Sequence, residues 1–150
     1  MASCQNFRNG IINEALLGYT DPNTKVLLLT DEDGTPIARS VFRLLSDEAG
    51  NPALHVESIY TRLATDGVTR AIYQHAVQKA KAMGIPLFAS SKSQNDEGVM
   101  VESSDVVGIT RTPSAAVLSA AQSRAPSVYV DSLGGEKHGS YSMANVATLS

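Results

Sequence analysis

The stretch "RLATDGVTRAIYQHAVQKAKAMGIPLFAS", from Arg62 to Ser90, decides the fold that the sequence predicts. Apolar residues recur at helical spacing through its middle: Val68, Ile72, Ala76, Ala80 and Met83. Thr65 or Asp66 suits the helix start and Gly84 its end, and the apolar run that follows predicts a strand. A helix between two strands forms a crossover, so this strand is expected to lie parallel to the strand that precedes the helix.

The segment before this stretch predicts an antiparallel meander of three strands. Two β-rich runs, Lys25 to Thr30 and Thr35 to Leu45, flank a turn that ends in Asp33-Gly34. A short loop then leads to a third run, Pro52 to Tyr60, and connections this short cannot cross over. Apolar spacing over Gln5 to Leu17 indicates a first helix.

The segment after residue 90 predicts a polar loop, one more helix and a closing hairpin. The polar loop covers Ser91 to Glu97, and Thr112-Pro113 is typical of a helix start, running to about Ser123. "PSVYVDS" and "GSYSMANVATL" flank Gly134-Gly135 as the two strands of the hairpin. The predicted fold class is therefore α+β, with a mixed sheet and one parallel crossover.

Composition limits the classes of function. Residues 1–150 are expected to form a single domain, either complete or taken from a longer protein. The net charge is -3, and the basic residues are scattered rather than gathered in a stripe, so we expect no nucleic-acid partner. No apolar run approaches the length of a membrane span, and the single cysteine, Cys4, favours a reducing, cytoplasmic setting without disulfides.

The order of elements and the segment "GVTRAIYQHAVQKAKAMGIPLF", Gly67 to Phe88, resemble the GNAT superfamily of acetyl-CoA-dependent N-acyltransferases. In that family a loop of the form Gln/Arg-x-x-Gly-x-Gly/Ala holds the pyrophosphate of acetyl-CoA. Gly67 matches the first glycine and Thr69 stands at the second small position, whereas Ala64 stands where the family has Gln or Arg. The resemblance implies these cofactor-binding residues: Ile59, Arg62, Leu63, Ala64, Thr65, Gly67, Val68, Thr69 and Arg70.

The resemblance also implies an acyl acceptor, a small-molecule or protein amine, and a general base on the strand before the loop. Alternation along "ALHVESIY" places His55, Glu57 and Ile59 on one face, with His55 and Glu57 about 7 Å apart. Glu57 is the first candidate for the base and His55 the second. The family's tyrosine is missing after Leu118, and Tyr129, with Tyr141 as the other possibility, is the substitute candidate for the general acid.

Other interpretations stay open. Thr65-Asp66-Gly67 is equally a plain cap and turn, and the face of His55 and Glu57 is equally a solvated sheet face. A domain that has lost its chemistry and binds a protein partner is a second functional class. A third is a hydrolase with Cys4 as nucleophile and His138 as base, oriented by Asn145 or Asp131.

Overall fold

A computed structural model describes residues 21–62, 66–90, 106, 108–120 and 127–150 of the chain, and the structural statements below concern these residues. The predicted first helix, Gln5 to Leu17, and the polar loop, Ser91 to Glu97, lie outside them. The described elements are, in chain order, β1 (Thr24–Thr30), β2 (Pro36–Ser46), β3 (Pro52–Val56), β4 (Tyr60–Thr61), α1 (Asp66–Met83), β5 (Leu87–Ser90), β6 (Arg111–Ser114), β7 (Leu118–Ala120), β8 (Val128–Val130), the 3-10 helix η2 (Asp131–Leu133), β9 (Gly135–Lys137), β10 (Tyr141–Met143) and β11 (Val146–Leu149).

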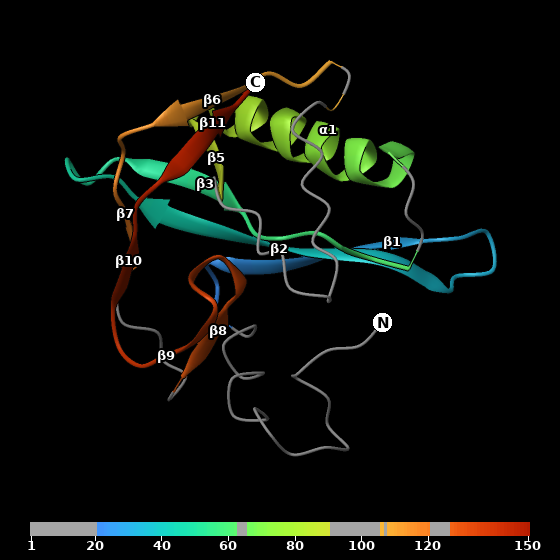
Figure 1. The fold of residues 1–150 in the computed structure, drawn as a ribbon, viewed down its shortest axis with the longest axis horizontal. Coiled ribbons are helices and arrows are strands. Elements are labelled where there is room, and N and C mark those ends of the chain that lie inside the picture. Colours follow the sequence, from blue (N-terminus) through green and yellow to red (C-terminus); the bar gives the residue numbers. More distant parts are fainter. Residues whose placement is uncertain (1–20, 63–65, 91–105, 107, 121–126) are drawn as a thin grey trace.

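The architecture is α+β, with a mixed sheet built around β2 and β3. The order of hydrogen-bonded neighbours is β10-β7-β2-β3-β5-β11-β6, and β1 and β4 also pair with β2. β8 and β9 form a separate antiparallel pair. Figure 1 shows α1 along one face of the main sheet and the β8–β9 pair on the other.

The predicted meander is confirmed. β1 pairs antiparallel with β2, and β2 pairs antiparallel with β3. In the turn between β1 and β2, a side-chain oxygen of Asp31 accepts hydrogen bonds from the backbone N–H groups of Asp33 and Thr35. Gly34 closes the turn with φ of +80°, a conformation that side chains rarely adopt, so glycine is needed here.

The predicted crossover is also confirmed. α1 leads to β5, which pairs in parallel with β3. Gly84 ends the helix in the left-handed conformation (φ 66°), and the N–H of Ile85 donates to the carbonyl of Ala80, as in a Schellman motif. Met83 is 45% exposed and lies at the edge of the predicted apolar stripe rather than in the core.

Two cores lie on the two faces of the sheet. The first packs α1 against β2, β3 and β5 and includes Val56, Ile72 and Ala76. The second packs the opposite face against β8 and includes Leu45, Phe88 and Val130. The sheet therefore carries apolar contacts on both sides.

The predicted helix from Thr112 to Ser123 is wrong over its described part. Arg111–Ser114 forms β6, which pairs with β11, and Leu118–Ala120 forms β7, which pairs with β10. Alanine and leucine favour a helix locally, but pairing with the sheet and the complete burial of Leu118 override that weak preference.

The predicted closing hairpin is wrong in its pairing. β8 does turn back at Gly134, but its partner is the short β9. The residues expected to pair with β8 instead form β10, beside β7, and β11, between β5 and β6. The turn at Gly134 depends on adjacent residues and is confirmed, whereas the partners of the last strands depend on contacts distant in sequence.

Candidate functional site

Alternation along β2 and β3 places polar side chains on the face that meets β8. On β2, Phe42 belongs to the core beneath α1, and Leu45 belongs to the opposite core. Arg43 lies directly across from His55 of β3, and the residue is buried. A charged residue and an imidazole therefore sit side by side in the interior.

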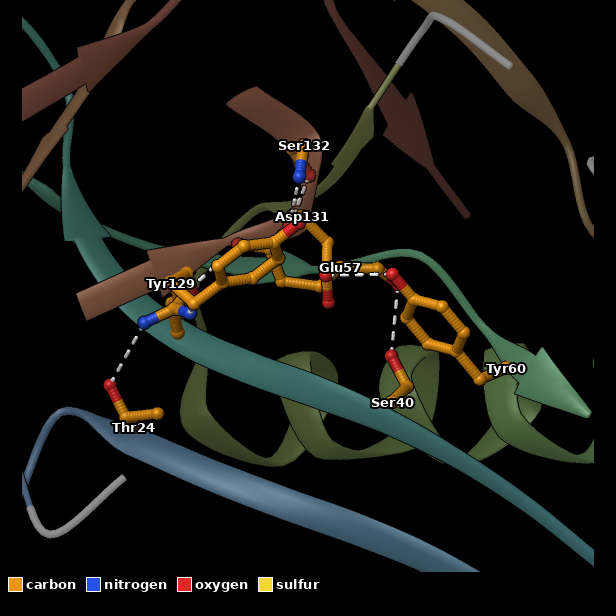
Figure 2. Close-up of polar contacts among 8 residues, drawn as sticks. Thr24, Ser40, Glu57, Tyr60, Tyr129, Asp131 and Ser132 are labelled. Atoms are coloured by element: carbon orange, nitrogen blue, oxygen red, sulfur yellow. Dashed lines mark hydrogen bonds and ion pairs between the residues drawn. The ribbon is translucent and has the colours of Figure 1, made fainter. Parts of the chain in front are cut away.

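Arg43 forms a buried ion pair with Glu57, which follows β3. The Nε atom of Arg43 lies 2.7 Å from Oε1 of Glu57, and the side chains are 3% and 0% exposed. The other carboxylate oxygen accepts hydrogen bonds from the backbone N–H of Ser132, at 2.8 Å, and from its hydroxyl. Figure 2 shows Ser132 above Glu57. Both oxygens of this carboxylate are thus engaged by donors from distant parts of the chain.

The guanidinium of Arg43 links further elements to this pair. It donates to the backbone carbonyl of Tyr129 at 2.6 Å and lies 3.5 Å from the hydroxyl of Thr24, at the limit of a hydrogen bond. The hydroxyl of Ser40 donates to the backbone carbonyl of Glu57. We call Arg43, Glu57 and Ser132 the charged cluster; it ties the main sheet to the layer formed by β8 and η2.

Beside the charged cluster, Tyr60 donates a hydrogen bond from its hydroxyl to Oδ1 of Asp131, at 2.7 Å. Burial raises the pKa of Asp131, the nearby charge of Glu57 adds to this, and the hydrogen bond from Tyr60 works in the opposite direction. Burial, followed by the charge of Asp131, also raises the pKa of Tyr60. The guanidinium of Arg39 stacks over the Tyr60 ring, 4.4 Å from its centre.

Replacing Asp131 with asparagine is expected to make the protein relatively more stable as pH rises. The pKa of Asp131 in the folded protein lies above its ordinary value of 3.8, so its ionisation costs stability between 3.8 and the folded-state pKa. Asparagine keeps an acceptor for Tyr60 but never ionises. The difference in free energy of unfolding between variant and wild type should grow through this window and then stay constant, as measured by urea unfolding at a series of pH values. If the free energies of unfolding of the two proteins change with pH in parallel, the pKa of Asp131 is not raised in the folded protein.

His55 is completely buried, and neither of its ring nitrogens has a hydrogen-bond partner in the described part of the chain. Burial lowers its pKa; the charge of Arg43 also lowers it, and the charge of Glu57 opposes this. The imidazole is therefore held neutral in the interior. Like Glu57, it has almost no access to solvent in this conformation.

The N-terminus of α1 contains the described part of the predicted cofactor loop. Gly67 is exposed, and an added Cβ would meet open space within 4 Å. Arg70, in the next turn, is half-buried, and its Nε atom is buried without a hydrogen-bond partner among the described residues. The structure thus places a glycine with open space and a guanidinium at one helix end.

The other predicted cofactor residues are placed differently. The side chains of Val68 and Thr69 are buried, and Arg62 is exposed, with its backbone N–H bonded to Ile37. Leu63, Ala64 and Thr65 lie outside the described residues. Ile59 was expected on the face of His55 and Glu57, which is wrong: it packs in the core beneath α1, because β3 ends at Val56 and its alternation stops there.

The remaining described candidates belong to β8, η2 and the segment after β9. Tyr129 is half-buried on β8, and its carbonyl accepts a hydrogen bond from Arg43. His138 is exposed, and Asp131 bonds to Tyr60. Cys4 lies outside the described residues, so its distance to His138 is not defined. The structure accordingly brings Glu57 and Asp131 into one region and leaves the proposed Cys–His pair untested.

Sequence reasoning missed Arg43, Ser132 and Tyr60 as members of this region. One signal was visible: Arg43 interrupts the apolar run "VFRLL", and a single arginine within a buried strand requires a partner. No comparable signal points to Ser132, whose hydrogen bond to Glu57 spans 75 residues of chain.

Comparisons with known proteins found no match: no protein-family model, curated protein or solved structure matches this chain. Within the described residues, no helix has the length and apolarity needed to cross a membrane. The same residues contain no group of three or more His, Cys, Asp or Glu side chains that could hold a metal ion.

Proposed function

We propose that this domain binds acetyl-CoA or another acyl-CoA at the N-terminus of α1 and transfers the acyl group to an amine. The observation that carries the proposal is the crossover itself. The connection between the parallel strands β3 and β5 consists of the short β4, which also pairs with β2, and then α1, so the N-terminus of α1 comes after the carboxyl ends of β3 and β4. In open α/β sheets, ligands bind outside the carboxyl ends of the strands, and we extend this rule to the parallel pair β3 and β5.

The helix end supplies the physical means to hold a pyrophosphate. The first four N–H groups of an α-helix have no partner within the helix, and the helix dipole favours an anion at that end. Gly67 has open space where a side chain would stand, so a phosphate can approach the backbone. The guanidinium of Arg70 adds a positive charge within one turn.

Acyl transfer also needs a group that accepts the proton of the attacking amine. Glu57 is the proposed base, but its carboxylate is paired with Arg43 and bonded to Ser132. This engagement favours a second candidate function, a domain that binds a partner or a CoA ligand without catalysis. A non-catalytic CoA-binding domain would share the cofactor site and differ in turnover, whereas a partner-binding domain would not need that site.

Changing Gly67 to alanine tests the shared site. Because alanine forms helices better than glycine and meets no clash here, the fold should gain about 0.5–1 kcal/mol of stability. The added methyl group should nevertheless weaken CoA binding about tenfold, since it separates phosphate and backbone. Calorimetric titration of the purified protein with CoA and acetyl-CoA, with thermal unfolding alongside, measures both effects.

Gly135→Ala is the matched control. Gly135 lies in β9 and also faces open space, so the change should leave CoA affinity unaltered. Wild-type binding should stabilise the fold by about 2.7 kcal/mol at a hundredfold excess over Kd. Absence of binding at millimolar CoA would end the acyltransferase proposal and would leave a domain that binds a protein partner as the remaining candidate.

A further inference from the structure

A groove of about 340 Å³ lies between β1 and the C-terminal half of α1. Its base is apolar: Phe42 and Leu54 are buried, and Leu27 is half-buried. Val26 and Met83, 44% and 45% exposed, add apolar surface that no described residue covers. A volume of this size falls in the range of sites for small ligands.

The charged groups of this groove have one sign. Lys25 on β1 and Lys79 on α1 both line it, both are exposed, and no described residue among those lining it is acidic. His75 adds an imidazole on the same side of α1. A ligand that matches these features has one apolar tail and one anionic head.

We propose that this groove binds a medium-chain carboxylate, with its hydrocarbon tail over Phe42 and Leu54 and its carboxylate between Lys25 and Lys79. The groove is separate from the proposed cofactor site: Lys79 stands about 18 Å from Gly67 along the helix axis. The proposal therefore does not depend on CoA binding.

The first test is titration with sodium hexanoate, octanoate and decanoate, each below its micelle concentration. Decanoate should bind with saturation at one molecule per chain. Affinity should rise about fourfold for each additional buried methylene group. Decanol should bind more weakly than decanoate because it lacks the negative charge. Equal affinity for the alcohol and the acid, or binding without saturation, would overturn the proposal.

The double variant Lys25→Gln and Lys79→Gln tests the cationic rim. Exposed ion pairs contribute little individually, so we expect the affinity for decanoate to fall by about three- to tenfold. Lys81→Gln is the matched control, because Lys81 is exposed on α1 and does not line the groove. An unchanged affinity for decanoate in the double variant would show that the carboxylate does not lie between Lys25 and Lys79.

The methionine methyl groups locate the ligand. Met83 lines the groove, whereas Met143 is buried in the core on the opposite face of the sheet. In NMR spectra of protein labelled at methionine methyl carbons, decanoate should shift the Met83 signal, assigned through Met83→Leu, and leave Met143 in place. A shift at Met143 with none at Met83 would place the ligand elsewhere and refute the proposal.

Discussion

Replacing Arg43 with leucine is expected to lower the free energy of unfolding by about 3–5 kcal/mol, the largest effect of any change considered for this protein. The change leaves the carboxylate of Glu57 buried without its cation, and it leaves the carbonyl of Tyr129 without the donor that Arg43 provides. Urea unfolding followed by circular dichroism should show the loss as a lower midpoint at nearly constant slope.

Arg39→Leu is the control for this prediction. Arg39 lies on the same strand, but it is half-buried and stacks on the ring of Tyr60, so its loss should cost about 1 kcal/mol or less. The double variant Arg43→Leu with Glu57→Leu removes both charges together. It should be less destabilised than the sum of the single changes, because no unpaired buried charge remains. If the loss of stability in the double variant equals the sum of the losses in the two single variants, Arg43 and Glu57 do not interact directly.

The charged cluster also bears on the proposed chemistry. A carboxylate that holds two layers together is constrained in position, and a general base must reach the proton it removes. The carboxylate of Glu57 is constrained in this way by Arg43 and Ser132. A change at Glu57 is therefore expected to alter stability as well as turnover, and loss of activity alone would not identify it as the base.

The sequence predicted those parts of the fold that short-range chemistry determines. The Asp-Gly turn between β1 and β2 and the end of α1 at Gly84 each depend on a few adjacent residues. The parallel pairing of β3 and β5 follows from the length of the connection between them. These features need no knowledge of distant contacts.

The parts predicted wrongly depend on contacts between distant segments. The residues from Thr112 onward have a helical composition, yet they form strands because β11 and β10 supply their hydrogen-bond partners. Similarly, alternation placed His55 and Glu57 on one face, but it could not show that Arg43 and Ser132 would bury them. Whether a polar sheet face is exposed to water depends on the segments that pack against it.

Replacing His55 with leucine is expected to stabilise the protein by about 1–3 kcal/mol at neutral pH, because it removes two buried nitrogens that have no partner among the described residues. Leucine is close to histidine in volume and would pack beside Phe88, the cross-strand neighbour of His55 on β5. The gain should increase as pH falls. The pKa of His55 in the folded protein lies below its ordinary value of 6.5, so beneath 6.5 the unfolded chain binds a proton that the folded chain does not.

The wild type should therefore lose up to about 1.4 kcal/mol of stability per pH unit from this residue, between 6.5 and the lower native pKa. The leucine variant lacks this loss, and subtracting the two stability curves cancels groups that titrate alike in both, including Asp131. His75→Leu is the control: His75 is exposed on α1, so its stability curve should stay within about 0.5 kcal/mol of the wild type. If His55→Leu is less stable than the wild type at neutral pH, the imidazole of His55 makes a favourable contact. The conclusion that His55 is neutral and has no hydrogen-bond partner among the described residues would then be wrong.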